Sequence, residues 1–203
     1  MASDDYFLEI ESHFAMRRNT PFILSAKDWA LMQRWRDEGI PLPVVIEAID
    51  SVFEKNESSG RRKVISSLSY CRHAVKEIWD ERRELFAGAA EGTPETDPSS
   101  ILEALAARVE AAGPADFAAR LRALERERSV PKLEARLMDL ERELIDALIA
   151  AAPEEADRMR REIAASLGDT SKLDPKVRAR TEEANLRRKI REHFAIPRLT
   201  LFG

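Results

Sequence analysis

The sequence has little of what disulfide-stapled or strand-rich folds require. It contains one cysteine, seven glycines and 6% aromatic residues in 203 positions, whereas alanine, leucine, glutamate and arginine are abundant. The single cysteine excludes an internal disulfide and favours a reducing compartment. The abundance of strong helix formers predicts an all-α protein. With 44% hydrophobic and 34% charged residues, the chain is expected to be globular rather than disordered.

Long apolar runs are also missing. No stretch approaches the length of uninterrupted apolar sequence that a membrane-spanning helix needs, so we expect no membrane span. The first residues are acidic and interrupted by polar side chains, which is unlike a secretory signal peptide. Together these absences predict a cytoplasmic protein. The net charge of −4 argues against a protein that coats nucleic acid, but it leaves room for a local basic face.

Catalytic motifs are scarce. The sequence has no GxxxxGK[ST], GxGxxG or GxSxG pattern. The pairs Glu9–His13 and His73–Glu77 have the i, i+4 spacing that a metal site between two helices can use, although ordinary charged helix faces have it too. Cys71 falls on the apolar stripe of a predicted helix, so we expect a buried thiol rather than a nucleophile. We therefore predict a non-enzymatic protein without a metal or other cofactor.

Hydrophobic periodicity predicts four helices in the N-terminal half, and we expect residues 1–86 to form an N-terminal four-helix module. Ser25 and Asp28 approximate a capping box at the start of the second helix, and Gly39 supplies its stop. The predicted helices span residues 4–18, 26–38, 43–56 and 64–87.

Residues 87–99, AGAAEGTPETDPS, lose the helical period and predict a linker. Beyond it we expect residues 100–194 to form a C-terminal helical bundle, with Ser100 and Glu103 as the capping box of its first helix. Its predicted helices span 100–112, 115–128, 132–151, 153–167 and 175–194. The acids between 124 and 143 alternate with arginines, which is typical of solvated helix surfaces.

Two basic clusters are candidate nucleic-acid contacts. Arg61, Arg62 and Lys63 precede or begin the fourth predicted helix, whose N-terminus favours an anion. Residues 172–191 carry eight basic and three acidic side chains, a net charge of +5 on an acidic chain. The side chains expected to line an anionic surface there are Arg180, Arg187, Arg188 and Arg191. For both clusters the alternative is a solvated charged surface.

The two predicted helices that flank Gly39 form a helix-turn-helix unit. Its second helix carries Glu47, Asp50 and Glu54, which would repel phosphates, so insertion of this helix into a DNA groove is not expected. The pattern from Trp35 to Gly39-Ile40 resembles helical modules of DnaD-type bacterial replication proteins.

Residues 195–203, AIPRLTLFG, form a C-terminal segment that we call the tail. Pro197 lacks an amide hydrogen and disfavours helical geometry in the preceding residue, so the last helix should end near 193–196 and the tail should be extended. Leu199, Leu201 and Phe202 each offer about 1.5–3 kcal/mol on full burial. They therefore require a pocket, either in a groove of the chain's own bundle or on another protein.

The tail residues Arg198-Leu199-Thr200-Leu201-Phe202 resemble the Gln-Leu-(Ser/Asp)-Leu-Phe motif by which bacterial polymerases and repair proteins bind the sliding clamp. The resemblance implies that Leu199 is the first anchor and that Leu201 and Phe202 are the terminal apolar pair, while Arg198 stands where the family has glutamine. We expect an adaptor or accessory protein of bacterial DNA replication or repair, which docks a protein partner through Arg198, Leu199, Leu201 and Phe202. The alternative is a structural helical subunit of a homo-oligomer or of a larger protein assembly.

Overall fold

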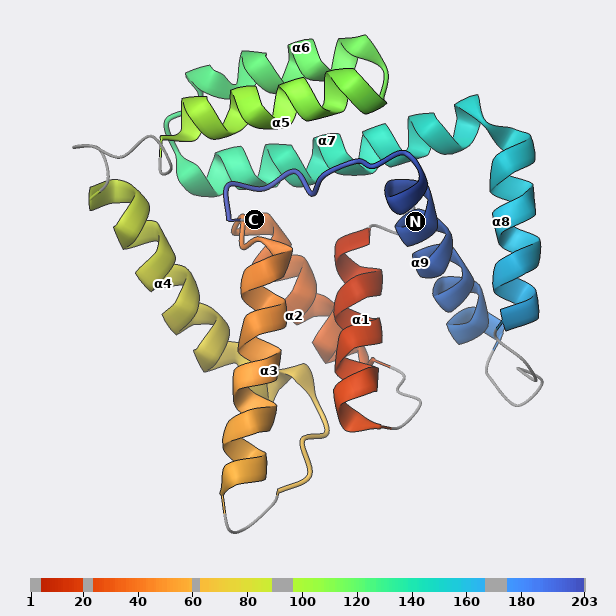
Figure 1. Ribbon diagram of the computed structural model, residues 1–203. Helices are drawn as coiled ribbons and strands as arrows, with labels where there is room; N and C mark the ends of the chain where they lie inside the picture. The colour runs from red at the N-terminus through yellow and green to blue at the C-terminus, as the bar shows by residue number, and fades with distance from the viewer. Residues whose placement is uncertain (1–4, 20–23, 60–62, 89–96, 167–174, 203) are drawn as a thin grey trace.

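The computed structural model describes residues 5–19, 24–59, 63–88, 97–166 and 175–202, and within these ranges it contains helices and no strands. Figure 1 shows a long helix, α7 (Val130–Ala151), with the hairpin α5 (Pro98–Ala112) and α6 (Ala115–Ala123) on one side. The helices of the N-terminal half lie on the other side of α7. The prediction of an all-α protein is confirmed.

The N-terminal half consists of α1 (Asp5–Arg18), α2 (Ala26–Asp37), α3 (Leu42–Ser58) and α4 (Arg72–Gly88). The predicted capping box starts α2: the Ser25 hydroxyl accepts from the Asp28 N–H, and the Asp28 carboxylate accepts from the Ser25 N–H, both at 3.2 Å. Gly39 follows α2 with a φ of +70°, the left-handed conformation that ends many helices.

The fourth helix begins eight residues later than predicted, at Arg72 instead of residue 64. A short 3-10 turn, η1 (Leu68–Cys71), precedes it. The Asp28 carboxylate of α2 accepts hydrogen bonds from the Ser67 hydroxyl at 2.7 Å and from the Leu68 N–H at 2.9 Å. These bonds fix the segment before η1 to α2 and offer its polar groups an alternative to helix formation.

The C-terminal half continues with α8 (Pro153–Ser166) and α9 (Pro175–His193), and α9 lies beside α1 (Figure 1). The capping box predicted at Ser100 does not form. Asp97 caps α5 instead, because its carboxylate accepts from the Ser100 N–H at 3.2 Å and Pro98 takes the first helical position. The helix predicted to reach residue 128 ends as α6 at Ala123, and a 3-10 turn, η3 (Leu124–Arg126), follows.

Direct contacts join the two halves. A Cβ at Gly39 would lie 1.9 Å from the carbonyl oxygen of Pro131, so the turn after α2 packs against the first turn of α7. Arg36 binds Asp139 of α7 at 2.9 Å. Of the predicted linker 87–99, residues 89–96 lie outside the described residues, and its two ends belong to α4 and to the start of α5.

The core is one hydrophobic cluster to which both halves contribute. The stripe predicted on α7 is buried in it, with Leu133, Leu137, Leu140, Leu144 and Leu148 all at most 4% exposed. Across the described ranges, no helix combines the length and the hydropathy needed to cross a membrane.

Candidate functional site: the tail and its buried acid–arginine network

The tail begins at a defined hinge after α9. Ala195 has a φ of +52°, its N–H donates to the Glu192 carbonyl at 3.2 Å, and the Ile196 N–H donates to the Arg191 carbonyl at 2.9 Å. This pair of bonds is a Schellman motif, with alanine in the left-handed position where glycine is usual. The prediction that the last helix ends near 193–196 is confirmed.

From this hinge the tail runs along α7 toward α3 and α4 (Figure 1). Its three apolar side chains are buried: Leu199 is 1% exposed, Leu201 5% and Phe202 7%. The Phe202 ring meets the ring of Trp79 in α4 edge to face, with centroids 5.5 Å apart. Of the two destinations that the sequence left open, the tail in this structure occupies the groove of its own bundle.

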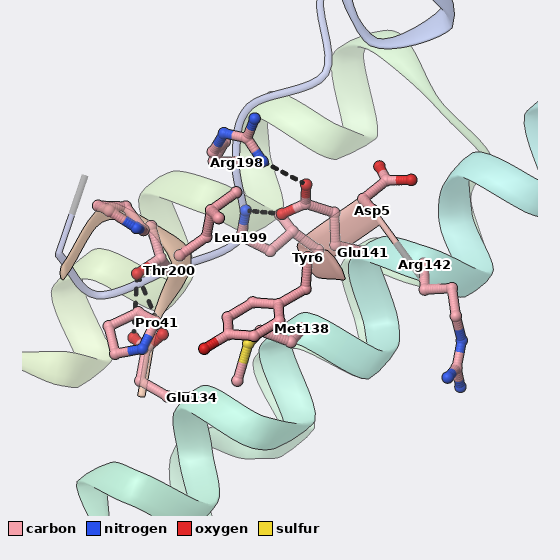
Figure 2. A pocket seen from close by; sticks show the side chains of 12 residues that line it. Asp5, Tyr6, Pro41, Glu134, Met138, Glu141, Arg142, Arg198, Leu199 and Thr200 are labelled. Atoms are coloured by element: carbon pink, nitrogen blue, oxygen red, sulfur yellow. Dashed lines mark hydrogen bonds and ion pairs between the residues drawn. The ribbon is translucent and has the colours of Figure 1, made fainter. Parts of the chain in front are cut away.

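Two glutamates of α7 bind the tail backbone. Figure 2 shows the bond of Glu141 to Leu199 and the contact of Glu134 with the Thr200 hydroxyl. The Leu199 N–H donates to Glu141 Oε2 at 2.7 Å, and the Leu201 N–H donates to Glu134 Oε1 at 2.6 Å. Glu134 also binds the Thr200 hydroxyl, at 3.0 Å from Oε2. Because the two glutamates are seven residues apart, they project from the same face of α7 and can bind one extended segment.

Glu134 is a fully buried acid. It is 0% exposed and has no ion pair with a cation in the part of the chain that the structure describes. Burial raises the pKa of Glu134 to about 8, against the lowering effect of the hydrogen bonds from Leu201 and Thr200, and the nearby Glu141 raises it further. At neutral pH the folded protein therefore holds this carboxyl largely protonated.

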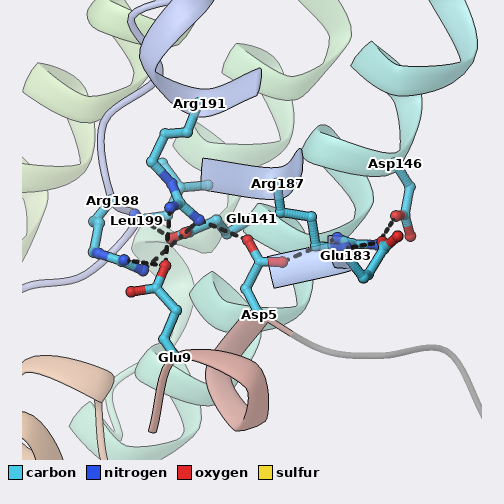
Figure 3. A network of polar contacts seen from close by, with 9 residues as sticks. All are labelled: Asp5, Glu9, Glu141, Asp146, Glu183, Arg187, Arg191, Arg198 and Leu199. Atoms are coloured by element: carbon cyan, nitrogen blue, oxygen red, sulfur yellow. Dashed lines mark hydrogen bonds and ion pairs between the residues drawn. The ribbon is translucent and has the colours of Figure 1, made fainter. Parts of the chain in front are cut away.

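Beside the tail lies a network of buried ion pairs centred on Arg191 of α9 (Figure 3). Its guanidinium contacts three carboxylates: Asp5 at 2.6 Å, Glu141 at 2.8 Å and Glu9 at 3.2 Å. Arg187, one helical turn earlier, binds Asp5, Asp146 and Glu183. The network thus joins α1, α7 and α9 at the point where the tail leaves α9.

Burial dominates the titration of Asp5 within this network. It raises the pKa of Asp5 to about 6, although Arg187 and Arg191 both act to lower it. Glu9 shows the opposite outcome: burial alone would raise its pKa, but Arg198 and Arg191 together hold it below the ordinary value.

Arg198 connects the tail to this network. Its guanidinium binds Glu9 of α1 and lies 3.6 Å from Glu141 of α7. A small cavity of about 30 Å³ lies beside it, lined by both tail-binding glutamates, by Tyr6 and by the tail (Figure 2). It has room for about two water molecules. The site therefore has the geometry of a bound peptide in a groove whose polar groups come from side chains.

The predicted nucleic-acid contacts on α9 do not share one surface. Arg187 and Arg191 instead point inward, with 5% and 8% exposure, because buried carboxylates of α1 and α7 neutralise them. Arg180 is half-buried, 4.5 Å from the ring centroid of Trp29, whereas the side chain of Arg188 is 60% exposed.

The other predicted basic cluster is described only in part. Arg61 and Arg62 lie outside the described residues. Lys63 is exposed, and its backbone N–H and carbonyl both bind the Asn56 side chain at 2.9 Å.

The candidate nucleophile is buried, and the candidate metal-ligand pair Glu9–His13 is engaged by other side chains. Cys71 is buried, as predicted, and burial raises the pKa of its thiol to about 12. His13 binds Asp50 at 2.8 Å. Among the described residues, no group of three or more histidines, cysteines or acids is arranged to hold a metal ion.

Glu134 and Glu141 are the tail-binding residues that sequence reasoning missed. Their alternation with arginines is typical of a solvated helix face, but both are buried. One sequence pattern could have identified them: each directly follows a leucine of the buried stripe, at the same position of successive heptads.

Comparison with known proteins adds little. A family model described as "Uncharacterised protein" matches residues 4–89, which comprise α1 to α4. No curated protein and no solved structure matches the chain.

Proposed function

We propose that this protein is a non-enzymatic adaptor that docks a protein partner through its tail, and that it stores the tail in its own groove when the partner is absent. The observation that carries the proposal is the way the tail is held: two glutamate side chains bind main-chain N–H groups of an extended segment. Extended peptides that dock on partner proteins are bound through main-chain hydrogen bonds and side-chain pockets in the same manner.

The tail can exchange between its own groove and a partner if its docked and released states have similar free energies. Burial of the four apolar side chains Ile196, Leu199, Leu201 and Phe202 stabilises the docked tail by roughly 6–12 kcal/mol. Ordering the seven residues 196–202 costs roughly 7–14 kcal/mol of backbone entropy. The hydrogen bonds to the buried glutamates offset the difference, so that the docked and released states differ by little free energy.

The partner that the motif at residues 198–202 favours is a bacterial sliding clamp. The adaptor would then act in DNA replication or repair in the cytoplasm. Nucleic-acid contact is proposed only through the exposed cations Lys63 and Arg188, because Arg187 and Arg191 are buried. Because so few cations would contact phosphates, the affinity for nucleic acid should depend only weakly on salt concentration.

The test measures binding of a bacterial sliding clamp to the full chain and to a synthetic peptide of residues 195–203. We expect roughly micromolar affinity for the peptide and weaker binding for the full chain, since only the released fraction of tails can bind. Glu141→Ala removes the acceptor for the Leu199 N–H and should strengthen binding, whereas Leu201→Ala/Phe202→Ala should abolish it.

The matched control is Glu143→Ala, which changes a carboxylate on the same helix that binds Arg120 and not the tail. It should leave clamp binding unchanged. Failure of the free peptide to bind any bacterial clamp would refute the docking role.

The edge-to-face contact between Phe202 and Trp79 favours a second candidate, a structural subunit whose tail completes a core, either its own or a neighbour's. Light scattering on the full chain and on residues 1–194 separates the two. A smaller assembly after removal of the tail supports a subunit whose tail completes a neighbour's core, and loss of the soluble folded protein supports a tail that completes its own core. An unchanged mass with retained solubility supports the adaptor.

A further inference from the structure

A second candidate binding site is a cleft of about 490 Å³ between α2, α4 and the first turn of α7. It adjoins the tail at Trp79, which lines the cleft and contacts the ring of Phe202. Leu31, Ile40, Trp79 and Pro131 provide apolar walls. This volume lies within the range of about 300–1,000 Å³ that is usual for ligand-binding clefts.

Four cations line the cleft: Arg34 of α2 and Arg72, Lys76 and Arg83 of α4. Two of them are neutralised in place, because Asp80 binds both Lys76 and Arg83. Arg34 and Arg72 are exposed and have no carboxylate partner within the described parts of the chain. The cleft therefore presents two uncompensated guanidinium groups on a protein whose net charge is −4.

The chemistry of the walls selects among anionic ligands. Nucleic acid binds such grooves by stacking bases on exposed aromatic faces and by following a row of cations. Here Trp35 and Trp79 are only 3% and 4% exposed, so they offer little ring face on which a base could stack. Glu38 and Asp80 also line the cleft and act against any anionic ligand, but the four cations outnumber them. An acidic peptide fits better, because an apolar side chain can pack on the partly exposed Leu31 and Pro131 while flanking carboxylates pair with the two arginines.

We propose that the cleft between α2, α4 and α7 docks an acidic peptide segment of a partner protein, with one apolar side chain inserted and carboxylates bound by Arg34 and Arg72. The inference goes beyond the proposed function. In the cleft this protein binds a peptide of a partner, whereas the tail is itself the peptide that a partner binds. Neither arginine belongs to the tail.

Fluorescence anisotropy on the full chain tests this inference. The probes are labelled peptides of the form Asp-Glu-Asp-X-Asp-Glu-Asp with leucine, phenylalanine or tryptophan at X, together with the glycine peptide and an oligothymidylate. We expect at least one apolar peptide to bind, and we expect the glycine peptide to bind at least about tenfold more weakly, since it lacks the apolar anchor.

The variant Arg34→Glu/Arg72→Glu should weaken peptide binding by tenfold or more, because two charge-assisted contacts are reversed. The milder Arg34→Gln/Arg72→Gln should weaken it in the same direction. The matched control is Arg108→Glu/Arg161→Glu, an equal change in charge at exposed arginines of α5 and α8.

Three outcomes overturn the proposal. They are binding of none of the three apolar peptides, equal weakening by the cleft variant and its control, and binding of the oligothymidylate alone with loss in the cleft variant. The last of these would assign the cleft to nucleic acid. Clamp binding by the tail is measured separately, so failure of one proposal leaves the other standing.

Discussion

Replacement of Glu134 by glutamine should change how the stability of this protein depends on pH. Glutamine has the shape of the protonated acid, and its amide oxygen can accept the hydrogen bond from the Leu201 N–H that Glu134 Oε1 now accepts. Glutamine cannot ionise. The variant therefore removes the pH-dependent contribution of the fully buried Glu134 carboxyl to the free energy of unfolding. The fold of the tail should survive the change.

The sign of the effect follows from the direction in which burial moves the pKa. Glu134 has a pKa of about 8 in the folded protein, above the ordinary value of 4.5 expected for the unfolded chain. Between these values the folded state binds more protons than the unfolded state, so the free energy of unfolding falls as pH rises. The fall is at most about 1.4 kcal/mol per pH unit and levels off above the folded pKa, which gives roughly 2 kcal/mol between about pH 6.5 and about pH 8.5 from this residue alone.

Urea unfolding of the wild type and of Glu134→Gln at several pH values measures this difference. The wild type should lose roughly 2 kcal/mol relative to the variant across that window. Asp5, with a pKa of about 6, titrates mainly below the window and is present in both proteins. Glu143→Gln on the same helix should behave like the wild type, because its partner Arg120 lies on the surface. Parallel pH profiles for the wild type and Glu134→Gln would refute the reasoning.

Three further predictions concern the hinge, the interface between the halves and the buried thiol. Ala195→Gly should raise the free energy of unfolding by about 1 kcal/mol in urea titrations, since the left-handed conformation is costly for alanine. Gly39→Ala should lower it by about 2 kcal/mol or more, because the added Cβ would collide with the Pro131 carbonyl at 1.9 Å. Gly113→Ala, whose Cβ would meet nothing closer than 3.3 Å, should cost less in the same titration. Cys71 should react with a thiol reagent at about pH 8 only after unfolding, and rapid labelling of the native protein would contradict its burial.

The sequence predicted the helices best where local chemistry decides their ends. The capping box at Ser25, the left-handed Gly39 and the stop before Pro197 all appear in the structure, because each depends on residues a few positions apart. The predicted start of α4 was wrong because Asp28, about 40 residues earlier, holds Ser67 and Leu68 outside a helix. No local pattern carries that information.

The candidate site depends even more on contacts between residues that are remote in the sequence. Periodicity predicts that Glu134 and Glu141 share a face of α7, but whether that face is solvated depends on what covers it. The tail, 58 residues or more along the chain, is what covers it. In the same way Arg187 and Arg191 face inward because Asp5, at the other end of the chain, lies beside them. The spacing of charges on one helix cannot reveal a partner that remote.

The clamp-binding motif that the tail resembles and the fold of this chain favour different residues at position 198, so a substitution there can separate the two roles. The clamp-binding motif has glutamine at this position, whereas in this chain the arginine binds Glu9 and lies 3.6 Å from Glu141. Arg198→Gln should therefore loosen the tail in its own groove while making it more similar to the motif. Because Arg198 helps to lower the pKa of Glu9, the stability it supplies is present above the ordinary carboxyl range and is lost as pH falls through it.

We expect Arg198→Gln to lower the free energy of unfolding by about 1–2 kcal/mol at neutral pH, a loss that shrinks toward acid pH, since the ion pairs are only partly buried. The same substitution should strengthen clamp binding by the full chain, because release of the tail and recognition of the peptide both become easier. A stability loss with unchanged clamp binding would mean that Arg198 serves the fold alone. In that case the tail is an extended structural segment of the core, and the result favours the second candidate function.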